Sequence, residues 1–140
     1  GDWGYYGSGT IRNNNANTAY GDAYVLDDVI GVALDVTNSK LYFSIDGVWQ
    51  NSGVPTSGAT GTGAVSITMA TNDQAFGAWF PSFCYYDSGT GTISVNFGNG
   101  YFGTTSSGTT EADDAGIGVF KYDVPAGYYA LCTNNLGDQS

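Results

Sequence analysis

Two runs of alternating apolar residues, joined by a short polar turn, constrain the fold of this chain more than any other feature. Apolar side chains occupy every second position over residues 30–36 and again over residues 41–45. A period of two places them on one face of a strand, so the two runs predict an antiparallel hairpin with one apolar face. Asp46-Gly47 follows directly and suits the positive φ angles of a two-residue hairpin turn. Residues 48–50 are therefore expected to fold straight back.

Shorter runs of the same kind recur along the chain, whereas helical periodicity is nearly absent. Further strands are expected from Val65 to Met69, over residues 79–86 with a proline near the start, and over residues 93–97. Turns rich in Gly, Ser and Asn separate these segments, which is typical of an all-β sandwich or barrel. The polar stretch 103–114 has no apolar face and is predicted to be an exposed, mobile loop.

Length and charge limit the classes of partner. The chain has 140 residues, which predicts one domain, and a net charge of −10 with only three basic residues. Nucleic acid and anionic membranes both need Lys and Arg to neutralise phosphate, so neither is an expected partner. No apolar run approaches a membrane span of about 18 residues, so membrane insertion is not expected.

Missing residue types exclude most catalytic chemistry. The chain has no histidine, so no imidazole is present to accept the proton of a Ser or Cys nucleophile. Two cysteines without histidine cannot complete a structural zinc site. Glu111 is the only glutamate, so a glycosidase would have to depend on paired aspartates. We therefore expect no catalytic residue, no cofactor and no metal ion.

Three features have both a functional and a structural interpretation, and the structural one is favoured for each. Residues 98–103 match G-x-G-x-x-G, but a dinucleotide site needs a helix next, and Thr-Thr-Ser-Ser-Gly is a poor helix. No EF-hand loop is present, so the acidic candidates for calcium are expected to be solvated carboxylates. These candidates are Asp27, Asp28, Asp113 and Asp114. Cys84 and Cys132 are expected to be small buried side chains, with a single disulfide as the alternative.

The tyrosines are the best candidates for binding. Many of the 11 lie at expected strand ends or beside turns, where a rigid apolar ring with a polar tip suits a contact surface. An asparagine-rich run at residues 13–17 occupies a loop between them, with a plain polar turn as the alternative. The predicted ligand-binding residues are Tyr5, Tyr6, Asn13, Asn14, Asn15, Tyr20, Tyr85 and Tyr86.

Several motifs resemble those of the SPRY domain family. D-V-I-G-V-A-L-D-V at residues 28–36 and L-Y-F-S-I-D-G-V-W at residues 41–49 resemble the centre of such a domain. F-P-S-F at residues 80–83 resembles its F-P strand, and T-I-S-V-N-F-G at residues 92–98 resembles its final strand. The resemblance implies an antiparallel β-sandwich of the concanavalin-like jelly-roll type. It also implies a module that has no catalytic activity and binds partners through loops at one end.

On this basis we expect three parts: a SPRY-like sandwich portion over residues 1–102, an exposed loop over residues 103–118, and a C-terminal segment over residues 119–140 that packs back on the sandwich. SPRY domains begin with several strands before the segment that opens here. A sandwich without them would expose strand edges, so we expect chain upstream of residue 1, or a neighbouring chain, to complete the fold.

The segment 120–136 resembles one that follows SPRY-like domains in phage and other viral proteins. This resemblance implies a structural protein on the surface of a phage or viral particle, as a decoration, fibre or adhesion domain in host attachment. The expected location is therefore the virion or the extracellular space. The expected partners are a protein or glycan surface, together with further copies of the chain in a homo-oligomer or particle. The alternatives are a carbohydrate-binding module of a secreted protein and, least favoured, a glycan hydrolase.

Overall fold

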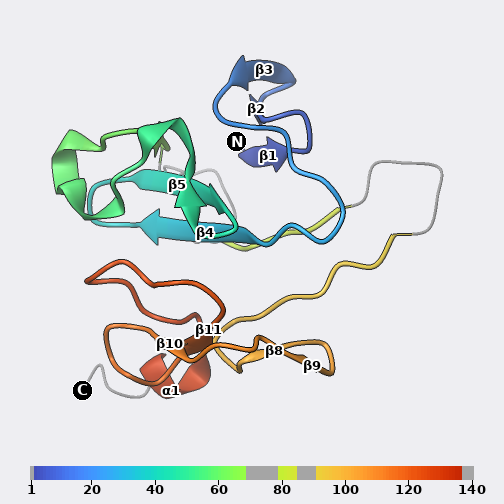
Figure 1. The fold of residues 1–140 in the computed structure, drawn as a ribbon. Helices are drawn as coiled ribbons and strands as arrows, with labels where there is room; N and C mark the ends of the chain where they lie inside the picture. Colours follow the sequence, from blue (N-terminus) through green and yellow to red (C-terminus); the bar gives the residue numbers. More distant parts are fainter. Residues whose placement is uncertain (1, 69–78, 85–90, 137–140) are drawn as a thin grey trace. The chain divides into compact units, whose positions relative to one another are not determined.

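The computed structural model describes residues 2–68, 79–84 and 91–136. The chain divides into two compact units, the first over Gly1–Asp73 and the second over Gln74–Ser140. Each unit is built from short antiparallel strands (Figure 1). The division predicted from the sequence, at residues 102 and 118, stays a prediction.

The first unit contains two antiparallel sheets. A three-stranded sheet has the order β1-β2-β3, and a four-stranded sheet has the order β4-β5-β6, with β7 also paired to β5. The strands are β1 (Gly4–Tyr6), β2 (Thr10–Asn13), β3 (Ala16–Ala19), β4 (Ile30–Asp35), β5 (Lys40–Ile45), β6 (Val48–Trp49) and β7 (Val65–Ser66). Two 3-10 helices, η1 (Gln50–Ser52) and η2 (Pro55–Thr60), lie between β6 and β7.

The hairpin predicted from the alternating runs is confirmed. Strands β4 and β5 pair along their full lengths, from Ile30 opposite Ile45 to Asp35 opposite Lys40. Asp46 and Gly47 have φ angles of 48° and 81°, as a two-residue turn between β5 and β6 requires. Strand β6 folds back on β5 as expected.

Strand β5 differs from the prediction of one apolar face. Its four central residues, 41–44, are all buried, so both faces of the strand are covered. On one face, Phe43 contacts the rings of Tyr5 and Tyr20. On the other, Tyr42 is fully buried and packs edge-on against Trp49, with ring centroids 6.5 Å apart. Ser44, which alternation places on a polar face, is 4% exposed.

The second unit has two small hairpins and one turn of helix. Strand β8 (Tyr101–Phe102) pairs with β9 (Thr105–Ser106), and β10 (Glu111–Ala112) pairs with β11 (Val119–Phe120). The helix α1 (Thr133–Leu136) follows. Most residues of the stretch 103–114 are exposed, as predicted, and its mobility stays a prediction. It contains β9 and β10, which the sequence did not predict, because hairpins this short need no apolar face and leave no alternation.

Two strands predicted from alternation do not form in the described residues. Residues 79–84 and 91–97 have no strand assignment, and Ile93 and Phe97 remain 49% and 41% exposed. Alternation fits a strand, but a strand also needs a neighbour to accept its hydrogen bonds, and none of the described residues provides one. Tyr85, Tyr86 and Met69 lie outside the described residues.

The prediction of an antiparallel all-β fold is confirmed. The strands pair antiparallel in both units, and the α-helix that the described residues contain is four residues long. Among the described residues, no helix has the length and apolar character to cross a membrane.

Candidate functional site

Tyr5 and Tyr20 are part of an aromatic cluster, defined here as Tyr5, Tyr20, Tyr24 and Phe43. Tyr5 stacks on Phe43 at a centroid distance of 5.2 Å, and Tyr20 meets both rings edge-on. The Tyr5 hydroxyl donates a hydrogen bond to the Asp22 carbonyl at 2.6 Å, and the Tyr20 hydroxyl accepts one from the Phe43 N–H at 3.3 Å. These two predicted binding residues therefore pack one sheet against the other.

The environment of the cluster changes the acidity of both phenols. Burial raises the pKa of Tyr5, and the nearby Asp22 carboxylate raises it further. Burial also raises the pKa of Tyr20 and outweighs the Phe43 N–H, which favours the phenolate. Both hydroxyls therefore stay protonated at neutral pH and act as hydrogen-bonding groups.

The other predicted binding residues that the structure describes, Tyr6 and residues 13–15, lie around Arg12. The Arg12 guanidinium sits 5.6 Å from the centroid of the Tyr6 ring and donates a hydrogen bond to Asn15 Oδ1 at 2.8 Å. Asn14 and Asn15 form the exposed turn between β2 and β3, with φ angles of 48° and 64°. Asn13 donates from Nδ2 to the Asp2 carbonyl at 2.7 Å. The contacts of the described residues thus divide the predicted set between the aromatic cluster and this Arg12 group.

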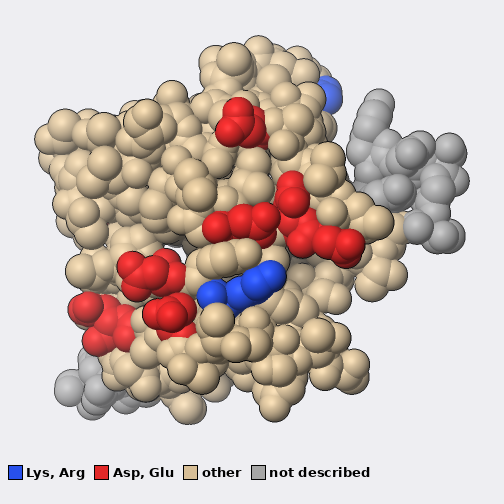
Figure 2. All heavy atoms as spheres, in the orientation of Figure 1, with Lys and Arg blue, Asp and Glu red and all other residues tan. Residues whose placement is uncertain are grey.

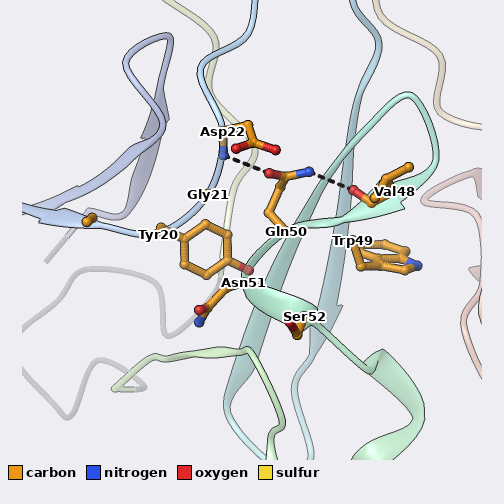
Figure 3. A pocket seen from close by; sticks show the side chains of 9 residues that line it. Tyr20, Gly21, Asp22, Val48, Trp49, Gln50, Asn51 and Ser52 are labelled. Carbon is orange, nitrogen blue, oxygen red and sulfur yellow. Dashed lines mark hydrogen bonds between the residues drawn. The ribbon is translucent and has the colours of Figure 1, made fainter.

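An open hollow of about 530 Å³ lies beside the cluster, where residues 19–22 meet residues 48–52 (Figure 3). The first segment follows β3, and the second runs from β6 into η1. Of the residues that line the hollow, only Tyr20 is among the binding residues predicted from the sequence. Its lining residues are Ala19, Tyr20, Gly21, Asp22, Val48, Trp49, Gln50, Asn51 and Ser52.

Gln50 fixes the two segments of the hollow to each other. Its side chain is 6% exposed, accepts a hydrogen bond from the Asp22 N–H at 2.8 Å and donates one to the Val48 carbonyl at 2.9 Å. Gly21 allows this close approach, because a Cβ atom there would lie 2.6 Å from Gln50 Oε1. We call this arrangement of Gln50 with Asp22, Val48 and Gly21 the Gln50 clamp.

The rim of the hollow is polar and acidic. Asp22, Asn51 and Ser52 are exposed, and the Val48 side chain is 66% exposed. Asn51 and Ser52 have φ angles of 55° and 53°, a left-handed turn that brings the chain round the edge of the hollow. None of the lining residues is basic.

The described residues offer contact surfaces, with no grouping typical of a metal centre. No three His, Cys, Asp or Glu side chains among them lie close enough together to hold a metal ion. On the face drawn in Figure 2, acidic side chains are more frequent than basic ones, and most of the surface carries neither charge. Asp22 is the one charged residue in the lining of the hollow, which is therefore suited to recognition through shape, hydrogen bonds and a single negative charge.

Asp113 is the main polar anchor of the second unit, and its prediction as a solvated carboxylate is wrong. It is 4% exposed. Its Oδ1 accepts from the Ile117 and Gly118 N–H groups at 2.8 and 2.9 Å, and its Oδ2 accepts from Ala130 N and Asn135 Nδ2 at 2.7 and 2.8 Å. Burial raises the pKa of the carboxyl, but these four hydrogen bonds outweigh burial and hold the pKa well below its usual range.

The remaining calcium candidates are more exposed than Asp113. Asp27 and Asp114 are exposed, as expected. Asp28 is half-buried, and its Oδ2 accepts a hydrogen bond from the Val25 N–H at 2.8 Å.

The cysteines do not form the disulfide considered above, and the glycine-rich motif does not form a dinucleotide site. Both cysteines are free thiols, so the alternative of a disulfide is wrong. Cys84 is exposed, which also contradicts the expectation that it is buried, and Cys132 is half-buried. The G-x-G-x-x-G run leads into the hairpin of β8 and β9, not into a helix, so no helix N-terminus is available for a pyrophosphate.

Comparison with known proteins gives one match. The family model described as SPRY domain matches residues 1–82. The matched span contains strands β1–β7 and the whole Gln50 clamp. It does not reach the motif at residues 92–98 or the segment at residues 120–136. Neither a search of curated proteins nor a search of solved structures finds a match.

Proposed function

The chain belongs to the SPRY domain family, and from this we propose that it is a non-enzymatic module that binds a partner protein in the hollow beside β6. SPRY domains are β-sandwiches that mediate protein–protein interactions. The hollow lies between two segments that leave the sheets at strand ends, which is where a β-sandwich presents its binding loops.

The Gln50 clamp is the observation that carries this proposal. A buried amide that bridges both segments holds their backbones in one arrangement before a partner arrives. A preformed site does not lose conformational entropy in ordering its own loops, so more of the contact energy appears as affinity. Meanwhile the exposed rim residues Asp22, Asn51 and Ser52 are available for contact.

The test starts from a random heptapeptide library displayed on beads and selected against the 140-residue chain. Amide resonances of the chain, followed by NMR while a selected peptide is added, should shift most for residues 19–22 and 48–52. Shifts that cluster elsewhere on the first unit would place the binding site outside the hollow and overturn the proposal.

A pair of valine variants tests the same site by affinity. Val48 contributes an exposed apolar side chain to the hollow, so Val48→Ala should weaken the selected peptide about two- to fivefold through lost contact area. Val32→Ala is the matched control, because Val32 is 58% exposed on β4 and does not line the hollow. Equal effects of the two variants would count against binding in the hollow.

A glycan surface is the competing partner. The predicted binding residue Tyr5 is already packed against Phe43 and Tyr20, which leaves Tyr6 as the more available of these two rings. A glycan array probed with the whole chain distinguishes these partners. Glycan binding that is lost in Tyr6→Ala, in the absence of any peptide binding, would replace the protein-binding proposal with a carbohydrate-binding one.

We further propose that the module acts on the surface of a phage or viral particle, as a decoration, fibre or adhesion domain present in several copies. The resemblance of residues 120–136 to segments of viral proteins supports this setting, and the strong negative charge favours a soluble, exposed protein. Mass spectrometry of purified particles from the source of the sequence is the direct test. Particles that lack peptides from this chain would refute the proposed location.

A further inference from the structure

We infer that the partner segment that enters the hollow carries a cationic side chain, arginine or lysine, which pairs with the Asp22 carboxylate. This inference rests on the proposed protein-binding function and adds the chemistry of the partner. The backbone and the side chain of Asp22 have different roles. The backbone is fixed, because its N–H donates to Gln50 and its carbonyl accepts from Tyr5.

The Asp22 carboxylate itself has no partner among the described residues. It is exposed at the hollow, and no hydrogen bond or ion pair within the described residues uses its oxygens. Figure 3 shows the carboxylate beside the Gln50 side chain. A fixed backbone with an unused charged group at a preformed hollow gives a partner cation a defined position to bind.

The chain's own cations near the start of the sequence have other contacts. Residues 1–73 contain two basic residues, Arg12 and Lys40, against seven aspartates. The Arg12 guanidinium contacts Tyr6 and Asn15. The Lys40 ammonium donates to Ser66 Oγ at 2.9 Å. Neither residue lines the hollow, and none of its lining residues is basic, so the described part of this unit supplies no positive charge there.

The Tyr20 ring adds a second feature that favours a cation. It lines the same hollow as Asp22 and lies between Asp22 and Asn51 in Figure 3. An arginine or lysine beside a tyrosine ring gains cation–π attraction, and a guanidinium can hydrogen-bond a carboxylate at the same time.

Other partner chemistries fit less well. An acidic or phosphorylated segment would meet the Asp22 carboxylate and a unit with seven aspartates against two basic residues, and like charges brought together at an interface are unfavourable. A neutral segment that covers Asp22 would offer its carboxylate only neutral hydrogen-bond donors, which bind it less strongly than a cation does. A basic segment avoids both costs and is also attracted over a longer range.

The library described above tests this inference through composition. Peptides that shift the resonances of the hollow should be enriched in arginine and lysine relative to the unselected library. The best such peptide is then titrated by calorimetry against the wild-type chain and against Asp22→Asn, which keeps the size and backbone groups of the residue. Binding to Asp22→Asn should be about three- to tenfold weaker, as expected for one charged hydrogen bond at a partly exposed site.

Asp27→Asn is the matched control. Asp27 is an exposed aspartate of the same unit and does not line the hollow, so its variant changes the net charge equally. Its φ angle of 72° is one that asparagine tolerates. Binding to Asp27→Asn should stay within about twofold of wild type, because an exposed charge outside the site is largely screened.

A salt titration of the wild-type chain gives a readout that needs no variant. Affinity for the basic peptide should fall as salt rises from low to about 1 M, where the screening length is about 3 Å. A peptide that binds the hollow with no enrichment in basic residues, or equally well to Asp22→Asn, would overturn the inference and leave the protein-binding proposal standing. If no peptide binds in the hollow, both are overturned.

Discussion

The two units of the chain are stabilised by different chemistry. In the first, rings and aliphatic side chains cover both faces of β5, and Tyr42 and Phe43 are 0% and 6% exposed. In the second, the described residues contain one buried apolar residue, Ala130, and the most connected side chain is the Asp113 carboxylate with four hydrogen bonds. The difference shows that a β-rich chain can hold one region by packing and the other by polar contacts.

Removal of the Tyr42 ring should cause the largest loss of stability, and the loss should fall on the first unit. Tyr42 is fully buried and contacts Trp49, so Tyr42→Ala leaves a cavity and should lower the free energy of unfolding of the first unit by about 3–5 kcal/mol. Urea unfolding followed by NMR amides of residues 30–50 measures this. Tyr42→Phe is the control, and it should cost about 1 kcal/mol, because it loses only the hydroxyl contact with Ser57. A cost below about 1 kcal/mol for Tyr42→Ala would contradict a packed core around β5.

Removal of the Asp113 carboxylate should be next in size. Asp113→Ala leaves three backbone N–H groups without their acceptor and removes one of the two hydrogen bonds that Asn135 Nδ2 donates, which should destabilise the second unit by about 3 kcal/mol. Hydrogen exchange of the Ile117, Gly118 and Ala130 amides is the direct measurement. Asp114→Ala, at the exposed neighbour, should change stability by less than about 0.5 kcal/mol. If both variants behave alike, Asp113 is not the anchor of this unit.

Acid should weaken the second unit through the same carboxyl group. The folded-state pKa of Asp113 lies well below its ordinary value. The stabilisation is therefore complete above the unfolded pKa of about 3.9, and is lost as the pH falls from there through the folded pKa. Stability of the second unit, measured by urea unfolding between about pH 6 and pH 2, should fall less steeply in Asp113→Asn than in wild type. Asp123→Asn, at another exposed aspartate, should keep the wild-type slope.

High pH should lower the stability of the first unit, and by less than acid lowers that of the second. Burial raises the folded-state pKa of Tyr5 and Tyr20. Their contribution is complete below the unfolded pKa of about 10, and is lost as the pH rises through the folded values. The double variant Tyr5→Phe, Tyr20→Phe should be less stable at neutral pH but lose less stability between about pH 9 and pH 11. If the stability of the double variant falls as steeply with rising pH as that of the wild type, the two tyrosines do not cause the alkaline loss of stability in the first unit.

Sequence reasoning was accurate where stability comes from packing. The period-two runs and Asp46-Gly47 predicted β4, β5 and β6 with the observed hairpin turn. They predicted one apolar face, and missed that Tyr42 is also buried. Alternation describes a single strand, whereas the covering of its second face depends on residues that follow in β6 and η2, among them Trp49 and Ser57.

Sequence reasoning failed where stability comes from hydrogen bonds between side chains and backbone. Asp113 looks like any loop aspartate, and Asn96 lies in the stretch 93–97 whose alternation predicts a strand. In the structure, Asn96 donates to the Val119 carbonyl at 3.0 Å and accepts from Gly98 N at 2.7 Å. Such contacts do not recur at a regular spacing along the chain, so no sequence pattern predicts them. In the hollow, the sequence shows Gln50 directly after a tight hairpin but does not show its burial, and only that burial reveals that both ends of its amide need partners.

The Gln50 clamp also bears on how the binding specificity of such a domain can change over generations. The atoms that hold the hollow open belong to Gln50, the backbone of Asp22 and Val48, and the glycine at position 21. The exposed atoms that the proposed partner would meet belong to other groups: the Asp22 carboxylate and the side chains of Val48, Asn51 and Ser52. Because the two sets barely overlap, substitutions at the rim can alter which partner is accepted without disturbing the scaffold beneath it.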